Sequence, residues 1–90
     1  MIIEAVGYRH LGERPDLSVG EKIEFEFEPT NLNDPNAILI MARGYKVGWV
    51  NRLQTKAFST WIEAGRVKAY VDRLNGTTAQ PRVYIFVAVV

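Results

Sequence analysis

The chain has 90 residues, 48% hydrophobic residues and a formal net charge of +1, which fits one small domain over residues 1–90 and excludes a strongly basic protein. It has no cysteine, so no disulfide supports its core. We find no run of about 20 apolar residues, as a membrane span requires, and no signal peptide at Met1. We therefore expect a cytoplasmic protein without a membrane partner.

The first half of the chain predicts four strands. Ile2–Tyr8 is apolar and partly β-branched. Lys22–Glu28 alternates apolar residues with glutamate, which is typical of a half-buried strand with a solvated acidic face. Ala37–Ala42 is nearly all apolar and reads as a central strand. Arg43-Gly44 predicts a turn that leads into Tyr45–Val50 as the other arm of a hairpin.

A single helix is predicted over Asn51–Glu63, with Asn51 as its N-cap and Gln54 as the capping-box partner. Apolar side chains recur at helical spacing, and we expect this face to be buried: Leu53, Ala57, Phe58, Trp61 and Ile62. Val67–Leu74 and Arg82–Val90 are the last two strands, around a loop at Asn75–Pro81. The fold class is therefore mainly β, a small curled six-stranded barrel capped by a helix at about 51–63.

The last strand is apolar on both faces. One face, with Val83, Ile85, Val87 and Val89, is expected to fill the barrel. The other face carries Tyr84, Phe86, Ala88 and Val90. It lies under the helix, pairs with another chain, or was covered within a larger protein.

The segment Pro29–Asn36 is the most informative part of the chain. It places three amides and one carboxylate between two strands, at Asn31, Asn33, Asp34 and Asn36. Such side chains bond to nearby backbone and build turns. Two interpretations stay open: a capped loop that only joins two strands, or a turn that holds polar groups toward a ligand.

The sequence gives little support for catalysis. It has one histidine, His10, and no cysteine, so nothing indicates a nucleophile with its base. Asp34 and Glu28 are too few carboxylates for a strong calcium site. We expect no enzymatic activity, no cofactor and no metal.

Cationic and aromatic residues elsewhere allow an anionic ligand. Arg9 and His10 end the first strand, either as exposed polar residues or as a phosphate clamp with a stacking ring. Trp49 belongs to the core by alternation, unless a bulge at Gly48 turns it outward. Arg52 and Lys56 are either solvated charges or phosphate contacts. Arg52 in the first helical turn opposes the helix dipole, which an anionic ligand would explain.

Three segments together resemble the HIRAN domain. Gly20-Glu21 precedes a strand, Glu28–Ile38 spans the polar turn, and Gly44–Arg52 leads to the helix. The positions that fall in step with the family pattern are Asn31, Asp34, Asn36, Ala37 and Gly48. Val6–Arg9 fits the family's first strand, and the resemblance covers about residues 5–75.

The resemblance implies an OB-like barrel of about six strands that binds DNA, and capture of a free 3′ end of single-stranded DNA in repair or replication-fork processing. By position, the implied DNA-binding residues are Arg9, His10, Asn31, Asn33, Asp34, Trp49 and Arg52, with Lys56 also near the phosphates. Two residues depart from the pattern. Asn33 stands where an aromatic side chain stacks, and Leu32 replaces a proline.

A second function stays open: a protein–protein interaction domain that uses the exposed C-terminal strand without binding nucleic acid. The low net charge and the acidic stripe Glu24–Glu28 favour it. The expected partners are thus single-stranded DNA or DNA ends, and a second copy of the chain bound through the C-terminal strand.

Overall fold

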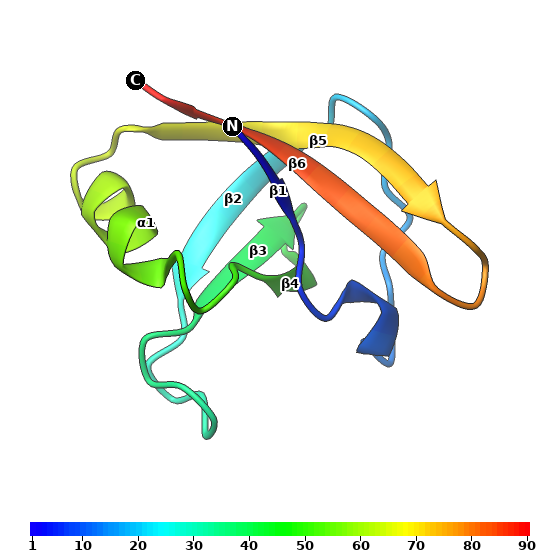
Figure 1. Ribbon diagram of the computed structural model, residues 1–90, viewed down its shortest axis with the longest axis horizontal. Coiled ribbons are helices and arrows are strands. Elements are labelled where there is room, and N and C mark those ends of the chain that lie inside the picture. Colours follow the sequence, from blue (N-terminus) through cyan, green and yellow to red (C-terminus); the bar gives the residue numbers. More distant parts are fainter.

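The computed structural model describes residues 1–90 as one six-stranded antiparallel sheet with one α-helix (Figure 1). The strand order is β1-β6-β5-β2-β3-β4. The elements are β1 (Ile2–Glu4), the 3₁₀ helix η1 (Tyr8–His10), β2 (Lys22–Phe27), β3 (Ile38–Ala42), β4 (Tyr45–Trp49), α1 (Thr55–Glu63), β5 (Val67–Gly76) and β6 (Pro81–Val89). The mainly β prediction is confirmed. No helix combines the length and the apolar character that crossing a bilayer requires.

The sheet curls until its two ends meet at a single bridge. The backbone N–H of Val6 donates to the carbonyl of Trp49 at 2.9 Å, and the N–H of Trp49 donates back to Val6 at 2.9 Å. The architecture is OB-like, but the predicted barrel is not closed by a continuous ladder. β1 ends at Glu4 rather than at the predicted Tyr8, and after the Val6 bridge the left-handed φ of 85° at Gly7 turns the chain away from β4.

The core lies inside the curl and under α1. The inner face of β6 supplies Val83, Ile85 and Val87, which are all buried as predicted. Val89 is 43% exposed, because it lies at the end of the strand beyond the core. From α1, Phe58 is fully buried and meets the ring of Phe25 edge-on at 5.4 Å.

The helix begins later than the sequence predicts. Residues 51–54 form a turn in which the N–H of Gln54 donates to the carbonyl of Asn51 at 2.8 Å. The Asn51 side chain accepts from the N–H of Leu53 at 2.9 Å, so Asn51 caps this turn rather than α1. The turn directs Leu53 outward, and its side chain is 89% exposed. The prediction that Leu53 is buried is therefore wrong. Ala57 is also exposed, whereas Trp61 and Ile62 are half-buried against the core.

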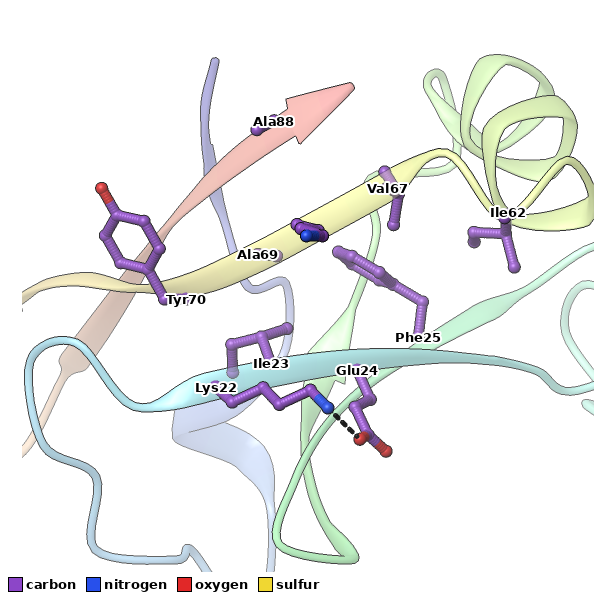
Figure 2. A pocket seen from close by; sticks show the side chains of 11 residues that line it. Lys22, Ile23, Glu24, Phe25, Ile62, Val67, Ala69, Tyr70 and Ala88 are labelled. Atoms are coloured by element: carbon purple, nitrogen blue, oxygen red, sulfur yellow. Dashed lines mark ion pairs between the residues drawn. The ribbon is translucent and has the colours of Figure 1, made fainter. Parts of the chain in front are cut away.

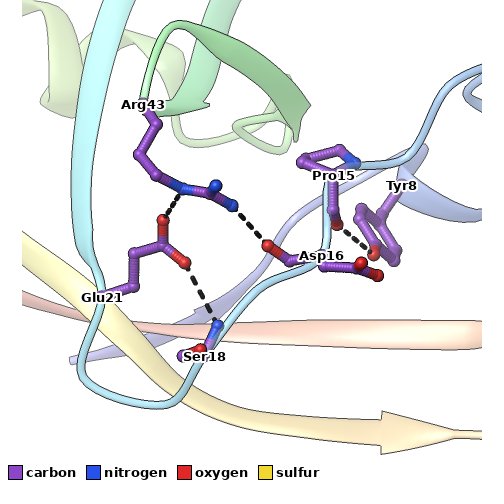
Figure 3. A network of polar contacts seen from close by, with 6 residues as sticks. All are labelled: Tyr8, Pro15, Asp16, Ser18, Glu21 and Arg43. Atoms are coloured by element: carbon purple, nitrogen blue, oxygen red, sulfur yellow. Dashed lines mark hydrogen bonds and ion pairs between the residues drawn. The ribbon is translucent and has the colours of Figure 1, made fainter.

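The predicted Arg43-Gly44 turn is confirmed. Arg43 and Gly44 have φ values of 51° and 79°, as expected for a hairpin turn with two left-handed residues. The Arg43 guanidinium donates to the Glu21 carboxylate and to the Asp16 carbonyl (Figure 3). The segment between η1 and β2, which contains Asp16, is also bound to η1, because the Tyr8 hydroxyl donates to the Pro15 carbonyl at 3.0 Å.

Candidate nucleic-acid interface

A bulge in β4 sets the position of Trp49. Ile40 lies opposite Gly48 while Met41 lies opposite Lys46, so β4 carries one extra residue. A Cβ at position 48 would lie 2.6 Å from the carbonyl oxygen of Val6. Gly48 therefore marks both a bulge and a close backbone approach. The Trp49 side chain is half-buried rather than part of the closed core.

Glu28 connects Trp49 to the polar turn. Its Oε1 accepts hydrogen bonds from Asn31 Nδ2 at 2.6 Å and from Trp49 Nε1 at 3.1 Å. Its Oε2 lies 3.8 Å from Lys46 Nζ. These donors, Asn31 first, lower the pKa of Glu28 below its ordinary value. The prediction that Glu28 belongs to a solvated strand face is wrong, because β2 ends at Phe27 and Glu28 turns toward β4.

The turn residues cap their own backbone, as the sequence predicts. Asn31 Oδ1 accepts from the N–H groups of Asn33 at 2.9 Å and Asp34 at 3.0 Å. Asp34 Oδ1 accepts from the N–H of Asn36 at 2.9 Å. This capping leaves the Asn33 side chain and the second carboxylate oxygen of Asp34 without a hydrogen bond from the protein. These groups are available to a ligand.

The turn, the end of β4 and the start of the following segment enclose a groove of about 460 Å³. We call it the turn groove. Its lining residues are Val6, Asn31, Asn33, Asp34, Ala37, Trp49, Val50, Asn51 and Arg52. Five of the eight predicted site residues thus meet in one place, although 21 positions separate Asn31 from Arg52. The groove offers amides, a carboxylate, an indole and a guanidinium.

Arg9 and His10 lie in a neighbouring hollow of about 340 Å³, lined also by Glu4, Arg82 and residues of η1. Val6 lines both this hollow and the turn groove, so the two are adjacent. Arg9 and His10 belong to η1 rather than to the end of a strand, because Gly7 turns the chain. Arg9 donates to His10 Nε2 at 3.1 Å and to Gln80 Oε1 at 3.3 Å. We call this the η1 hollow.

Lys56 stands apart from the other predicted site residues. It is exposed on α1 and lines neither the turn groove nor the η1 hollow. The structure thus gathers five predicted residues in the turn groove, two in the η1 hollow, and leaves Lys56 outside both.

Comparison with known proteins identifies the family. Residues 1–90 match the HIRAN domain. The chain belongs to the HIRAN domain family. The crystal structure of the HIRAN domain of human HLTF has a similar fold, with a TM-score of 0.71, 19% identity and coverage of 98% of this chain and 74% of that one. A protein from Lactobacillus plantarum gives a TM-score of 0.58 at 21% identity, with coverage of 97% and 91%. No match was found among curated proteins.

HIRAN domains are small binding domains, and membership of the family supports nucleic-acid binding in general terms. The structural matches are below 25% identity, so they establish the fold and not the ligand.

Three residues that line or hold the turn groove and the η1 hollow were not among the predicted site residues. Glu28 organises the turn groove, Asn51 lines it, and Arg82 joins Arg9 in the η1 hollow. One signal was readable for Glu28, because it directly precedes Pro29, where a strand ladder commonly ends. Arg82 gave no signal, because β6 reaches the η1 hollow only through its pairing with β1.

A larger hollow, of about 860 Å³, lies between β2, β5 and α1 (Figure 2). It opens because β2 and β5 pair only at Lys22 with Tyr70 and Ile23 with Ala69. Its walls include Phe25, Ile62 and Val67, and an ion pair of 3.3 Å joins Lys22 to Glu24 at its rim. This apolar hollow lacks the convergent polar groups of the turn groove, and Lys68 and Tyr70 of β5 are among its lining residues.

Proposed function

We propose that this HIRAN domain is a non-enzymatic module that binds single-stranded DNA at its free 3′ end. The observation that carries the proposal is the turn groove, where Asp34, Trp49 and Arg52 line one cavity. A carboxylate oxygen accepts a hydrogen bond from a hydroxyl, an indole offers a face or edge to a base, and a guanidinium binds phosphate. A 3′-terminal nucleotide presents all three groups.

The η1 hollow supports a path for the second nucleotide. Arg9 and His10 lie beyond Val6, the residue shared with the turn groove. A backbone phosphate in the η1 hollow would share that cavity with Arg9, whose guanidinium forms no ion pair with any carboxylate of the chain. Two neighbouring cavities, one for the 3′-terminal nucleotide and one for the next phosphate, suit the terminus of a DNA strand better than an isolated nucleotide.

The proposal assigns the stacking role to Trp49, because Asn33 occupies the position at which an aromatic side chain stacks in a member of the family that the sequence resembles. Trp49 is held by its hydrogen bond to Glu28 and by contact with Gly7, where an added Cβ would lie 3.1 Å from the ring. An indole fixed in this way loses little conformational freedom when a base packs on it. We place the activity in DNA repair or replication-fork processing, where free 3′ ends arise.

Fluorescence anisotropy with trinucleotides tests the proposal. The oligonucleotides carry either a free 3′-hydroxyl or a 3′-phosphate, and the label is on the 5′ end. We expect the 3′-hydroxyl form to bind more tightly, because a terminal phosphate would lie beside the Asp34 carboxylate. Asp34→Asn keeps the acceptor for the Asn36 N–H but removes the charge, so the preference should shrink.

The control is Glu26→Gln, which removes one carboxylate from the exposed face of β2, outside the turn groove. It should leave the preference unchanged. Equal binding of both trinucleotides by the unmodified protein, or no binding even at low salt, would overturn the 3′-end proposal.

A further inference from the structure

The outward face of β6 carries aromatic side chains that the core does not use. Since Val83, Ile85 and Val87 point inward and are buried, Tyr84 and Phe86 point outward, where they are half-buried. Phe86 lies opposite Tyr70 of β5, and the two rings stack with centroids 5.2 Å apart and an interplanar angle of 23°. No helix covers this face, because α1 packs against the opposite side of the sheet through Phe58.

A cation packs on one of these rings. The Arg73 guanidinium lies 4.5 Å from the centroid of the Tyr84 ring. Charged residues at non-buried positions of β1, β2, β5 and β6 are Glu4, Lys22, Glu24, Glu26, Lys68, Asp72, Arg73 and Arg82. Two of these carboxylates are paired with cations, Glu24 with Lys22 at 3.3 Å and Glu4 with Arg82 at 4.0 Å, whereas Glu26 and Asp72 form no ion pair. Neither Lys68 nor Arg73 forms an ion pair with any carboxylate of the chain.

The aromatic face is continuous with the proposed DNA site. Glu4 and Arg82 line the η1 hollow and also belong to the outward side of β1 and β6. Along β6, the outward residues Arg82, Tyr84 and Phe86 follow one another at about 7 Å, since each residue of a strand rises ~3.4 Å. A DNA strand with its 3′ end in the turn groove and its next phosphate near Arg9 would therefore continue over these three side chains.

We propose that the outward face of β6 and β5 is a second part of the DNA site, on which bases upstream of the 3′ end stack. Tyr84 with Arg73 forms the first stacking position, and Phe86 with Tyr70 forms the second. Lys68 and Arg73 contact the backbone. Aromatic platforms beside cations are the usual means of holding single strands without reading their sequence. This inference rests on the proposed function, because the turn groove sets the direction in which the strand leaves.

A second copy of the chain is a less favourable occupant of this face. A twofold dimer places the same patch on both partners. It would therefore place the unpaired Lys68 and Arg73 of both copies in one interface, where the like charges oppose association. A polyanion meets the same cations with opposite charge. The deciding feature is therefore the pair of unpaired cations beside the aromatic rings, Lys68 and Arg73, and not the net charge of the face.

The experiment compares 3′-hydroxyl oligothymidylates of three and nine nucleotides, labelled at the 5′ end, by fluorescence anisotropy. We expect the nine-nucleotide strand to bind the unmodified protein at least fivefold more tightly than the three-nucleotide strand. Tyr84→Ala and Tyr70→Ala should reduce the affinity for nine nucleotides to that for three. Both should leave trinucleotide binding unchanged. Val19→Ala, at a 67% exposed loop residue, is the matched control and should change neither affinity.

Each other outcome is decisive. Equal affinity of the unmodified protein for both lengths overturns the inference while leaving the 3′-end proposal intact. The inference is also overturned if nine nucleotides bind more tightly than three and Tyr84→Ala and Tyr70→Ala do not reduce this difference. Sedimentation that shows a dimer which Tyr84→Ala abolishes, with unchanged binding of nine nucleotides, would assign the face to self-association instead. The converse outcome is that the protein fails to bind trinucleotides but binds nine nucleotides in a way that requires Tyr84 and does not depend on the 3′ end. That result would reject the proposed function and retain the outward face of β6 and β5 as a DNA site.

Discussion

Trp49 and Glu28 are 21 positions apart in the sequence, and the indole Nε1 donates to the carboxylate Oε1 at 3.1 Å. The same oxygen accepts from Asn31 Nδ2 at 2.6 Å. One carboxylate thus joins the end of β4 to the polar turn, so the two walls of the turn groove are held as a unit. A ligand that enters the groove meets side chains whose positions are already fixed, which lowers the entropy lost on binding.

The Glu28 carboxylate should make stability depend on pH. Hydrogen bonds from Asn31 and Trp49 lower its pKa in the folded protein below the ordinary value of 4.5. A lowered folded pKa means that this stabilisation is present above the unfolded value and is lost as the pH falls through the folded pKa. We expect the free energy of unfolding, measured by urea titration, to decrease between pH 5 and pH 3.

Glu28→Gln tests that contribution. Glutamine keeps an oxygen that can accept from both donors but lacks the charge that strengthens these bonds. The variant should be less stable by about 1 kcal/mol at pH 7, with a shallower decrease in acid. The pKa of Glu21 is lowered as well, by hydrogen bonds from the Ser18 N–H and from Arg43. In the double variant Glu21→Gln/Glu28→Gln, the free energy of unfolding should therefore decrease even less as the pH falls. An unchanged pH profile for Glu28→Gln would contradict the assignment.

Gly48→Ala should break the bridge that joins the two ends of the sheet. The added methyl group would lie 2.6 Å from the Val6 carbonyl oxygen, and backbone cannot move away as a flexible side chain does. We expect a loss of roughly 1–3 kcal/mol, as for other overpacked sites, and faster exchange of the Val6 and Trp49 amides. Gly12→Ala is the control, because nothing lies within 4 Å of a Cβ there. Similar melting of both variants would argue against the close approach.

Phe58 should dominate the stabilising contacts of α1. It is fully buried and meets Phe25 at 5.4 Å and Trp61 at 5.2 Å. Phe58→Ala should cost about 3–5 kcal/mol, enough to unfold much of a domain this small. Leu53→Ala, at a residue that is 89% exposed, should stay within about 0.5 kcal/mol of the unmodified protein. Thermal melts followed by circular dichroism distinguish this result from the buried Leu53 that the sequence predicts.

The salt dependence of binding should separate Arg9 from Lys56. Each phosphate neutralised on a single strand contributes about −0.7 to the slope of log affinity against log salt concentration. Arg9→Ala should therefore flatten the slope for trinucleotides by about one such contact. Lys56→Ala should leave it unchanged, because Lys56 lines neither cavity. A flattening on Lys56→Ala alone would place the phosphates over α1.

Local sequence patterns determined the strands, the hairpin turn and the capped polar turn. Alternation of apolar residues, a turn signal at Arg43-Gly44 and asparagines that bond to nearby backbone act over a few residues, so they can be read without the fold. The same locality explains the error at Leu53. Helical spacing predicts a buried face, whereas one hydrogen bond from the Leu53 N–H to the Asn51 side chain sets a separate turn and directs Leu53 outward.

Contacts between distant segments were decided by the tertiary structure alone. The role of Glu28 depends on a bulge in β4 that aims Trp49 toward the turn, and the separation of Arg9 from the turn groove depends on the left-handed Gly7. Arg82 and the aromatic row of β6 reach the proposed DNA-binding side only because β6 pairs with β1. The sequence thus supplied the chemistry of the site, whereas the pairing of strands far apart in the chain decided which of those groups act together.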